Sequence, residues 1–233
     1  MSQIAQHLNI VTDRITKVAR NSNRSPNEVT LLAVSKTKPL EAIMEAYQFG
    51  QRRFGESYAQ EAAAKIDRLS QMPGFDDIEW HFIGPLQSNK SRLVAERFDW
   101  VQSVDRSKLI ERLQQQRPAA MAPLNVCLQV NVSGEASKSG VQAEEIFALA
   151  RQVADCDRLV LRGIMAIPEH TRDEVRLADQ MARMQQLFTR LQADYASVDT
   201  LSMGMTEDLE LAIAHGSTMV RIGTAIFGAR DYA

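Results

Sequence analysis

Features that mark secreted and membrane-bound proteins are missing from this sequence. Among its 233 residues only Cys127 and Cys156 are cysteines, and no Cys-x-x-Cys pair occurs. This scarcity argues against a disulfide scaffold and fits a reducing compartment. No run approaches the roughly 18 apolar residues of a membrane-spanning helix, and Met1 to Arg20 lack the apolar core of a signal peptide. We therefore expect a cytoplasmic protein with no membrane partner.

Other absences narrow the function further. The net charge of −2 gives no electrostatic reason to expect nucleic acid as a partner. The histidines His7, His81, His170 and His215 are scattered and show no metal-ligand spacing. No Gly-x-Gly-x-x-Gly turn follows an early apolar segment, although an open doubly wound sheet that binds dinucleotides would carry one. The sequence predicts neither a metal centre nor such a sheet.

Short apolar segments alternate with amphipathic ones along the whole chain. With 45% hydrophobic and 24% charged residues, the composition is that of an ordinary globular protein. The apolar segments predict strands at 29–34, 53–56, 79–84, 100–104, 124–132, 159–167, 199–204 and 219–223. Such alternation indicates a parallel sheet with helical crossovers, and eight repeats fit a (β/α)₈ barrel. We expect residues 1–233 to form one such domain, with an open doubly wound sheet as the alternative.

Apolar and capping patterns also locate helices. Ile4, Leu8, Val11, Ile15 and Val18 recur at three- and four-residue spacing, which predicts an extra N-terminal helix against the barrel. Capping-box patterns at 57–60 and 171–174 predict two further helix starts.

Lys36 follows the first predicted strand, where a barrel places its functional groups. A lysine can lose its proton and attack a carbonyl group, provided that burial or a nearby positive charge lowers its pKa. The alternative is that Lys36 and Lys38 are solvated loop lysines before a helix.

The loops after strands seven and eight, 202–206 and 221–224, combine glycine with hydroxyl residues, as phosphate sites of barrels do. Arg221 alternates with Val220 and Ile222, so its side chain is predicted to point into the barrel. Because strands one and eight are neighbours in a closed barrel, a phosphate ester with an aldehyde, such as pyridoxal phosphate, could bridge Lys36 and these loops. Alternatively, Ser202 merely ends a strand and Gly223 forms a turn.

Long motifs along almost the whole chain carry a resemblance to a known family. They read LLAVSKTKP (31–39), WHFIGPLQSNK (80–90), QVNVSGEASKSG (129–140), LRGIMAIP (161–168), LSMGMTEDLE (201–210) and GSTMVRIGTAIFGAR (216–230). On these motifs the sequence resembles the pyridoxal-phosphate homeostasis proteins, the YggS family. The resemblance implies a barrel like the N-terminal domain of alanine racemase, of the fold-type III class of pyridoxal-phosphate proteins.

The resemblance also implies a set of cofactor-binding residues. Lys36 would hold pyridoxal 5'-phosphate as a Schiff base, and Arg221 would face the pyridine nitrogen. The phosphate would be held by residues of the last two loops, namely Ser202, Gly223 and Thr224 with the backbone of Met203 and Gly204.

Further contacts are expected around the cofactor ring. Val34 lies next to the lysine turn, and either His81 or Ile83 could line the ring, although His81 could equally be a satisfied core histidine. The family reads FGEN after strand two, whereas this chain has Ser57 in place of the asparagine, which puts any contact of that amide in doubt. The loop 133–140 lacks the glycines of a Walker loop. We expect it to be a mobile lid whose Lys138 reaches the cofactor or an incoming anion; the alternative is a flexible βα loop without a role at the site.

The expected function is to carry and buffer pyridoxal phosphate without turnover, which would maintain vitamin B6 and amino-acid homeostasis. The alternative is a racemase or decarboxylase of the same barrel type. The racemases carry a second domain whose tyrosine acts as a base, and this sequence, which ends soon after strand eight, offers no counterpart. An aldolase-like Schiff-base enzyme without cofactor is a third class. We expect a monomer, with apo-enzymes that require pyridoxal phosphate as recipients.

Overall fold

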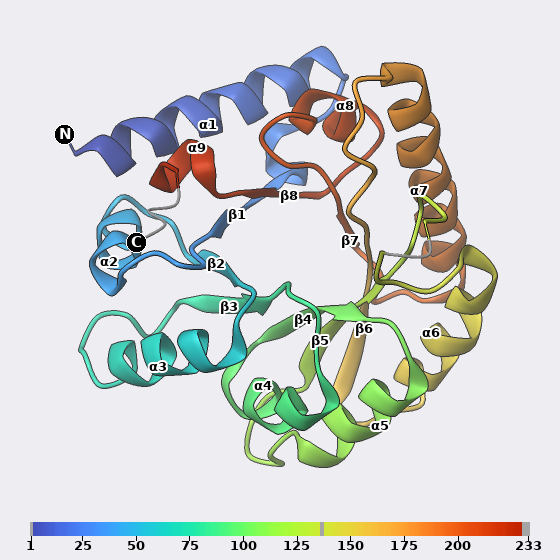
Figure 1. Cartoon of the computed structure of the whole chain (residues 1–233), viewed down its shortest axis with the longest axis horizontal. Helices are drawn as coiled ribbons and strands as arrows, with labels where there is room; N and C mark the ends of the chain where they lie inside the picture. The colour runs from blue at the N-terminus through green and yellow to red at the C-terminus, as the bar shows by residue number, and fades with distance from the viewer. Residues whose placement is uncertain (1, 136–137, 230–233) are drawn as a thin grey trace.

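The computed structural model describes residues 2–135 and 138–229. Within them, eight parallel strands close into a barrel in sequence order, which confirms the predicted (β/α)₈ architecture. The strands are β1 (Thr30–Val34), β2 (Arg53–Glu56), β3 (Glu79–Phe82), β4 (Trp100–Val104), β5 (Leu124–Gln129), β6 (Leu159–Met165), β7 (Thr200–Ser202) and β8 (Met219–Ile222). Figure 1 shows the strands in the middle of the molecule and the helices around them.

Closure of the barrel joins the first strand to the last. β1 and β8 pair in parallel, with Leu32 opposite Arg221 and Ala33 opposite Ile222. The carboxyl ends of β1 and β8 therefore lie side by side, although about 190 residues separate them along the chain. This pairing brings the lysine turn next to the last glycine-rich loop, as the sequence predicts.

The helices form the outer layer. They are α1 (Gln3–Asn21), α2 (Leu40–Gln48), α3 (Ala59–Leu69), α4 (Ser91–Arg97), α5 (Ser107–Gln116), α6 (Ile146–Ala154), α7 (Glu174–Asp194), α8 (Leu209–Ala214) and α9 (Thr224–Phe227). The additional helix α1 packs beside α2, α8 and α9. It is tied to them by an ion pair between Arg14 and Glu210, at 2.5 Å, and by a hydrogen bond between His7 and the Ile226 carbonyl, at 2.9 Å.

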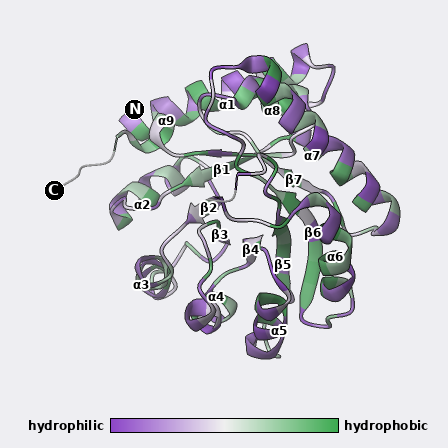
Figure 2. Cartoon of the chain, turned by 45° about the vertical axis from the view of Figure 1, so that its right-hand side comes forward, coloured by the Kyte–Doolittle hydropathy of each residue, from purple (hydrophilic) through white to green (hydrophobic). Residues whose placement is uncertain are grey.

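The main core lies between the strands and the helices. One face of each long helix is apolar, so it can cover the outer side of the barrel wall. In Figure 2, hydrophobic residues concentrate on the central strands such as β5 and β6, and the helices carry hydrophilic residues as well. The inside of the barrel is different, because several buried polar side chains meet there.

The capping boxes predicted at 57–60 and 171–174 are wrong. Helix α3 begins at Ala59, with Tyr58 as its N-cap and no side-chain cap. The backbone of Ser57 instead packs against Gly84, where an ideal Cβ would lie 2.2 Å from the Ser57 carbonyl oxygen, and this contact keeps Ser57 outside the helix. Helix α7 is capped by Asp173, whose carboxylate accepts a hydrogen bond from the Arg176 amide.

Candidate functional site

Lys36 lies just beyond the carboxyl end of β1, in a tight turn, and is half-buried. The turn is closed by a hydrogen bond from the Lys38 amide to the Ser35 carbonyl oxygen at 3.0 Å. Thr37 adopts a left-handed conformation with φ 63°, which a non-glycine residue adopts only when its surroundings hold it there. The turn therefore has a fixed shape.

A buried cluster holds this turn from the outer side of the barrel. The Lys65 ammonium group, on α3, donates to the Ser35 carbonyl at 3.0 Å and to the carboxylates of Glu56 at 2.8 Å and Glu61 at 2.6 Å. The Ser35 hydroxyl donates to Glu56 at 2.7 Å, and the Thr37 amide donates to Glu61 at 2.7 Å. Burial raises the pKa of Glu56, and Lys65 opposes that shift. Both backbone groups that flank Lys36 are thus fixed by one ion cluster.

Two glycines permit close packing beside the turn. An ideal Cβ on Gly223, which precedes α9, would lie 3.2 Å from the Val34 carbonyl oxygen. Gly204, after β7, has φ +96°, and a Cβ there would lie 2.5 Å from the Cβ of Ala212. A side chain on Gly223 would crowd the ends of β1 and β8, whereas one on the buried Gly204 would collide with α8. Of the two, the half-buried Gly223 therefore leaves backbone accessible at the mouth of the barrel.

Arg221 points into the barrel, as the alternation in β8 predicts. It is only 5% exposed and donates to the Ser202 hydroxyl oxygen and to the Ala166 carbonyl oxygen, both at 2.8 Å. Burial lowers its pKa to about 10. Among the described residues it makes no salt bridge, so its positive charge is held by neutral acceptors alone. The Arg221 guanidinium would therefore donate a hydrogen bond to an anion or to a lone pair of a ligand bound at this mouth.

Ser202 and Met203 are both engaged within the protein. The Ser202 hydroxyl donates to the Gln102 side-chain oxygen at 2.6 Å while accepting from Arg221. Met203 is buried in the outer core; its amide donates to the Met219 carbonyl oxygen at 3.2 Å and its own carbonyl accepts from Ser217 at 2.7 Å. The loop predicted to bind phosphate is thus tightly packed at these two residues, and Gly204, which follows them, is buried as well.

His81 is a satisfied core histidine, one of the two interpretations that the sequence left open. It is fully buried, stacks on Trp100 with ring centroids 4.9 Å apart, and bonds Glu79 through Nε2 at 2.8 Å and Gln102 through Nδ1 at 2.9 Å. Ile83 is half-buried and closer to the mouth, where its Cδ1 would lie 3.2 Å from a Cβ on Gly55. Ile83 is therefore the better placed of the two to line a bound ring.

The remaining predicted residues lie at the rim. Ser57 is half-buried after β2. Lys138 donates to the Pro168 carbonyl oxygen at 3.2 Å and pairs with Glu135 at 3.3 Å, while residues 136–137 of the predicted lid lie outside the described residues. Lys38 donates to the Ala229 carbonyl oxygen at 2.5 Å. The structure brings Lys36, Gly223, Thr224, Arg221 and Val34 to one mouth, with Gly204 and Ile83 on its other strands.

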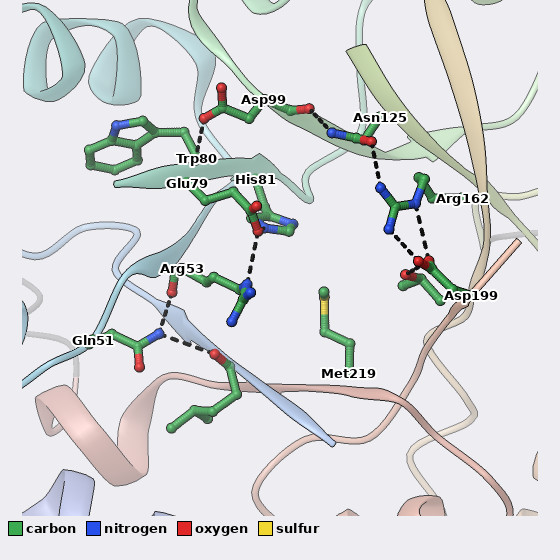
Figure 3. A network of polar contacts seen from close by, with 12 residues as sticks. Gln51, Arg53, Glu79, Trp80, His81, Asp99, Asn125, Arg162, Asp199 and Met219 are labelled. Atoms are coloured by element: carbon green, nitrogen blue, oxygen red, sulfur yellow. Dashed lines mark hydrogen bonds and ion pairs between the residues drawn. The ribbon is translucent and has the colours of Figure 1, made fainter. Parts of the chain in front are cut away.

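Sequence reasoning missed the polar side chains inside the barrel, above all Gln102 and Glu79. Alternation with the apolar Ile78 and Trp80 marks Glu79, but Gln102 lies between Val101 and the polar Ser103. Alternation alone also does not say which face is interior. Glu79 opens onto a cavity of about 420 Å³ at the opposite, amino-terminal end of the barrel, part of which Figure 3 shows with Arg53 beside Glu79 and with Arg162 beside Asp199. Because the arginines there are paired with carboxylates, this end fits a stabilising role.

Two features are absent from residues 2–135 and 138–229. No helix there has the length and apolar character to cross a membrane. No group of three or more histidine, cysteine, aspartate or glutamate side chains there could hold a metal ion.

Comparison with known proteins places this barrel in a class. Residues 7–231 match the sequence model of the family described as alanine racemase, N-terminal domain. An alanine racemase of Corynebacterium glutamicum shares the fold at 14% identity, with a TM-score of 0.73, over 97% of this chain and 61% of that one. The chain thus belongs to the class of alanine-racemase-type barrels.

Nearer relatives define the particular family. The pyridoxal phosphate homeostasis protein of Escherichia coli K12 is 55% identical over 233 residues, covering 100% of this chain and 99% of that protein. The protein of that name from Pseudomonas aeruginosa is 54% identical over 232 residues, covering 100% of this chain and 98% of the relative. PipY of Synechococcus elongatus, solved with pyridoxal phosphate bound, has 35% identity and a TM-score of 0.80, over 97% of this chain and 100% of PipY. The chain belongs to the family of pyridoxal phosphate homeostasis proteins.

Proposed function

We propose that this protein binds pyridoxal 5'-phosphate at the carboxyl-terminal mouth of its barrel and carries and buffers the cofactor without turnover of its own. The observation that carries the proposal is the pairing of β1 with β8, which sets the Lys36 turn beside the loop of Gly223 and Thr224. A lysine amine next to exposed backbone and a hydroxyl group suits an aldehyde that also bears a phosphate. The names of the relatives and the bound cofactor in PipY support this choice of ligand.

The residues at the mouth fit that ligand, and each would have a distinct role. The bound cofactor supplies an aldehyde carbon, which a lysine amine can attack with release of water. Lys36 would be the point of attachment. Gly204, Gly223 and Thr224 would receive the phosphate, Arg221 would face the ring nitrogen, and Val34 and Ile83 would line the ring. Direct contact of Ser202 with the phosphate would require its hydroxyl to turn away from Gln102.

Arg221 is compatible with a carrier but does not decide against an enzyme, because the racemases that this sequence resembles also use an arginine there. A guanidinium group facing a pyridine nitrogen disfavours protonation of that nitrogen, and an unprotonated ring is a weaker electron sink. We also propose that the protein acts as a monomer in the cytoplasm and passes the cofactor to apo-enzymes that need it. Light scattering of the purified protein, cell fractionation and reactivation of such an apo-enzyme test these three statements separately.

The attachment is tested by spectroscopy and mass mapping. The purified protein is mixed with pyridoxal phosphate, and its visible spectrum is recorded before and after borohydride treatment. Borohydride donates a hydride to the carbon–nitrogen double bond and fixes the cofactor, so we expect a stable adduct on the peptide that contains Lys36. The Lys36→Ala variant should lose the adduct, and Lys38→Ala, which changes a neighbouring lysine, should keep it. A protein that takes up no pyridoxal phosphate would overturn the proposal.

The carrier role is tested by offering the loaded protein amino acids. We expect neither racemised nor decarboxylated product at rates above those of the Lys36→Ala variant. Robust turnover that requires Lys36 would instead establish the racemase or decarboxylase alternative.

A further inference from the structure

A continuous chain of hydrogen bonds crosses the inside of the barrel. We call it the interior chain; it consists of Glu79, His81, Gln102, Ser202 and Arg221. The distances from Glu79 to Arg221 are 2.8 Å, 2.9 Å, 2.6 Å and 2.8 Å between successive partners. These residues come from β3, β4, β7 and β8, so the interior chain connects the amino-terminal cavity with the carboxyl-terminal mouth. Figure 3 shows the amino-terminal end of the interior chain, where Glu79 lies between His81 and Arg53.

The charge of Glu79 determines the direction of the first bonds. Burial opposes ionisation of Glu79, but the hydrogen bond from His81 and the guanidinium of Arg53 outweigh it and lower its pKa. The Glu79 carboxylate therefore accepts a hydrogen bond from His81 Nε2. Burial lowers the pKa of His81, so the ring is neutral and its Nδ1 accepts. Gln102 must then turn its amide nitrogen toward His81.

The orientation of Gln102 determines the direction of the remaining two bonds, from Ser202 to Gln102 and from Arg221 to Ser202. With its nitrogen toward His81 and the Met219 sulfur, at 3.1 Å, Gln102 presents its oxygen to Ser202. The single hydroxyl proton of Ser202 is donated to that oxygen, which leaves the Ser202 lone pairs for Arg221. All four bonds run the same way, from a cation to an anion through three neutral groups. Bonds aligned in this manner polarise and strengthen one another.

We propose that the interior chain is a positioning device: it holds Arg221 toward the cofactor ring, and Ser202 acts on the bound cofactor through Arg221 instead of contacting its phosphate. The inference rests on the proposed function, because it assumes that the mouth binds pyridoxal phosphate. Glu79 serves as the distant counter-charge of Arg221, which makes no salt bridge among the described residues. The polar residues inside the barrel thus serve the site, although only one of them reaches its mouth.

A comparison of two ligands separates positioning from phosphate contact. Affinities of pyridoxal phosphate and of pyridoxal, which lacks the phosphate, are measured by equilibrium titration for each variant. If Ser202 acts through Arg221, Ser202→Ala should weaken both ligands by the same factor, about 10-fold. Thr224→Ala, at the proposed phosphate loop, should weaken pyridoxal phosphate alone. Ser103→Ala, which removes a buried hydroxyl group that lies outside the interior chain and has no partner within the described residues, should change neither affinity.

A second variant interrupts the interior chain at Gln102, which is fully buried between the carboxyl-terminal mouth and the amino-terminal cavity. Gln102→Met keeps the length of the side chain and removes both its hydrogen-bonding groups. We expect the same equal loss for the two ligands and a displaced visible band of the bound cofactor, because Arg221 is no longer held toward the ring; circular dichroism confirms the fold. Loss of affinity for pyridoxal phosphate alone in Ser202→Ala, or unchanged affinities and band in folded Gln102→Met, overturns the inference. If the wild-type protein binds neither ligand, the proposed function itself fails.

Discussion

Gly163 packs directly against the backbone of Thr200: an ideal Cβ on Gly163 would lie 1.8 Å from the Thr200 carbonyl oxygen. Gly163 also has φ +150°, and the register between β5 and β6 shifts just before it, where it pairs with Cys127. The approach sets the register of β6 on β7, in which Met165 lies opposite Ser202. Gly163, which lies far from the mouth, therefore fixes the position of Ser202 along the barrel axis.

This contact predicts a large effect of a single methyl group. Gly163→Ala must move the backbone of β7 and should lower the free energy of unfolding by about 3 kcal/mol or more. The control is Gly50→Ala, which has a similar backbone demand, with φ +92°, but nothing within 4 Å of its added Cβ; it should cost only about 1 kcal/mol. Urea unfolding of both variants makes the measurement. Equal losses would show that close packing at Gly163 is unimportant.

The cluster beneath the lysine turn predicts a second strong effect. Lys65→Met leaves the buried carboxylate of Glu56 without its cation, and one oxygen of that carboxylate already lacks a partner among the described residues. The free energy of unfolding should fall by about 3–5 kcal/mol, measured by urea titration at pH 7. The exposed pair of Arg183 and Asp179 on α7 is the control, because Arg183→Ala should cost about 0.5 kcal/mol or less. A similarly small loss in Lys65→Met would contradict the role given to the cluster.

Much of the fold follows from local patterns. The bounds of β2 and β4 coincide with the predicted 53–56 and 100–104, because Gly50 ends the helix before β2 and the charged Asp99 and Asp105 flank β4. The inward direction of Arg221 follows from simple alternation in β8. The adjacency of Lys36 and Gly223 follows from closure, which the count of strands already implies. These features depend on short-range periodicity and on the geometry of a closed barrel.

The features that escaped prediction depend on contacts between distant segments. Ser202 and Gln102 are 100 residues apart, and nothing near either residue in the sequence specifies the other. Ser57 matches a helix-capping pattern, but packing against Gly84 overrides that local preference. Lys65 resembles an ordinary helix-surface lysine paired with Glu61 four residues earlier, until the fold places the buried carboxylate of Glu56 beside it. Tertiary packing decides each of these cases, so local sequence could not.

Glu79 predicts an acid-sensitive part of the stability. Its folded-state pKa lies below its ordinary value of 4.5, so its contribution is present above about pH 4.5 and is lost as the pH falls through the lowered pKa. For a side chain that is 34% exposed and faces a neutral His81, solvent screening reduces that contribution to about 1 kcal/mol. Glu79→Gln should lose this amount at pH 7 and show a shallower decline below pH 4.5 in urea unfolding.

The control for Glu79 is Glu111→Gln, which alters an exposed carboxylate on α5 and should leave the pH profile of stability unchanged. If Glu79→Gln and the wild-type protein lose stability in parallel between pH 5 and pH 3, the ionised Glu79 carboxylate is not stabilised by its partners. Its negative charge would then contribute nothing to the interior chain.

Gly223 predicts how the mouth responds to a single added methyl group. Its φ of −113° is open to any residue, so Gly223→Ala should fold, at a cost of about 1–2 kcal/mol for a Cβ lying 3.2 Å from the Val34 carbonyl oxygen. Because the strand ends must move apart beside Lys36, affinity for pyridoxal phosphate should fall by about 10-fold, whereas pyridoxal should lose less. Gly74→Ala, with nothing within 4 Å of its added Cβ, should leave both affinities unchanged. Unaltered binding in Gly223→Ala would place the phosphate elsewhere on the mouth, because a phosphate bound to the Gly223 backbone would be displaced by the added methyl group.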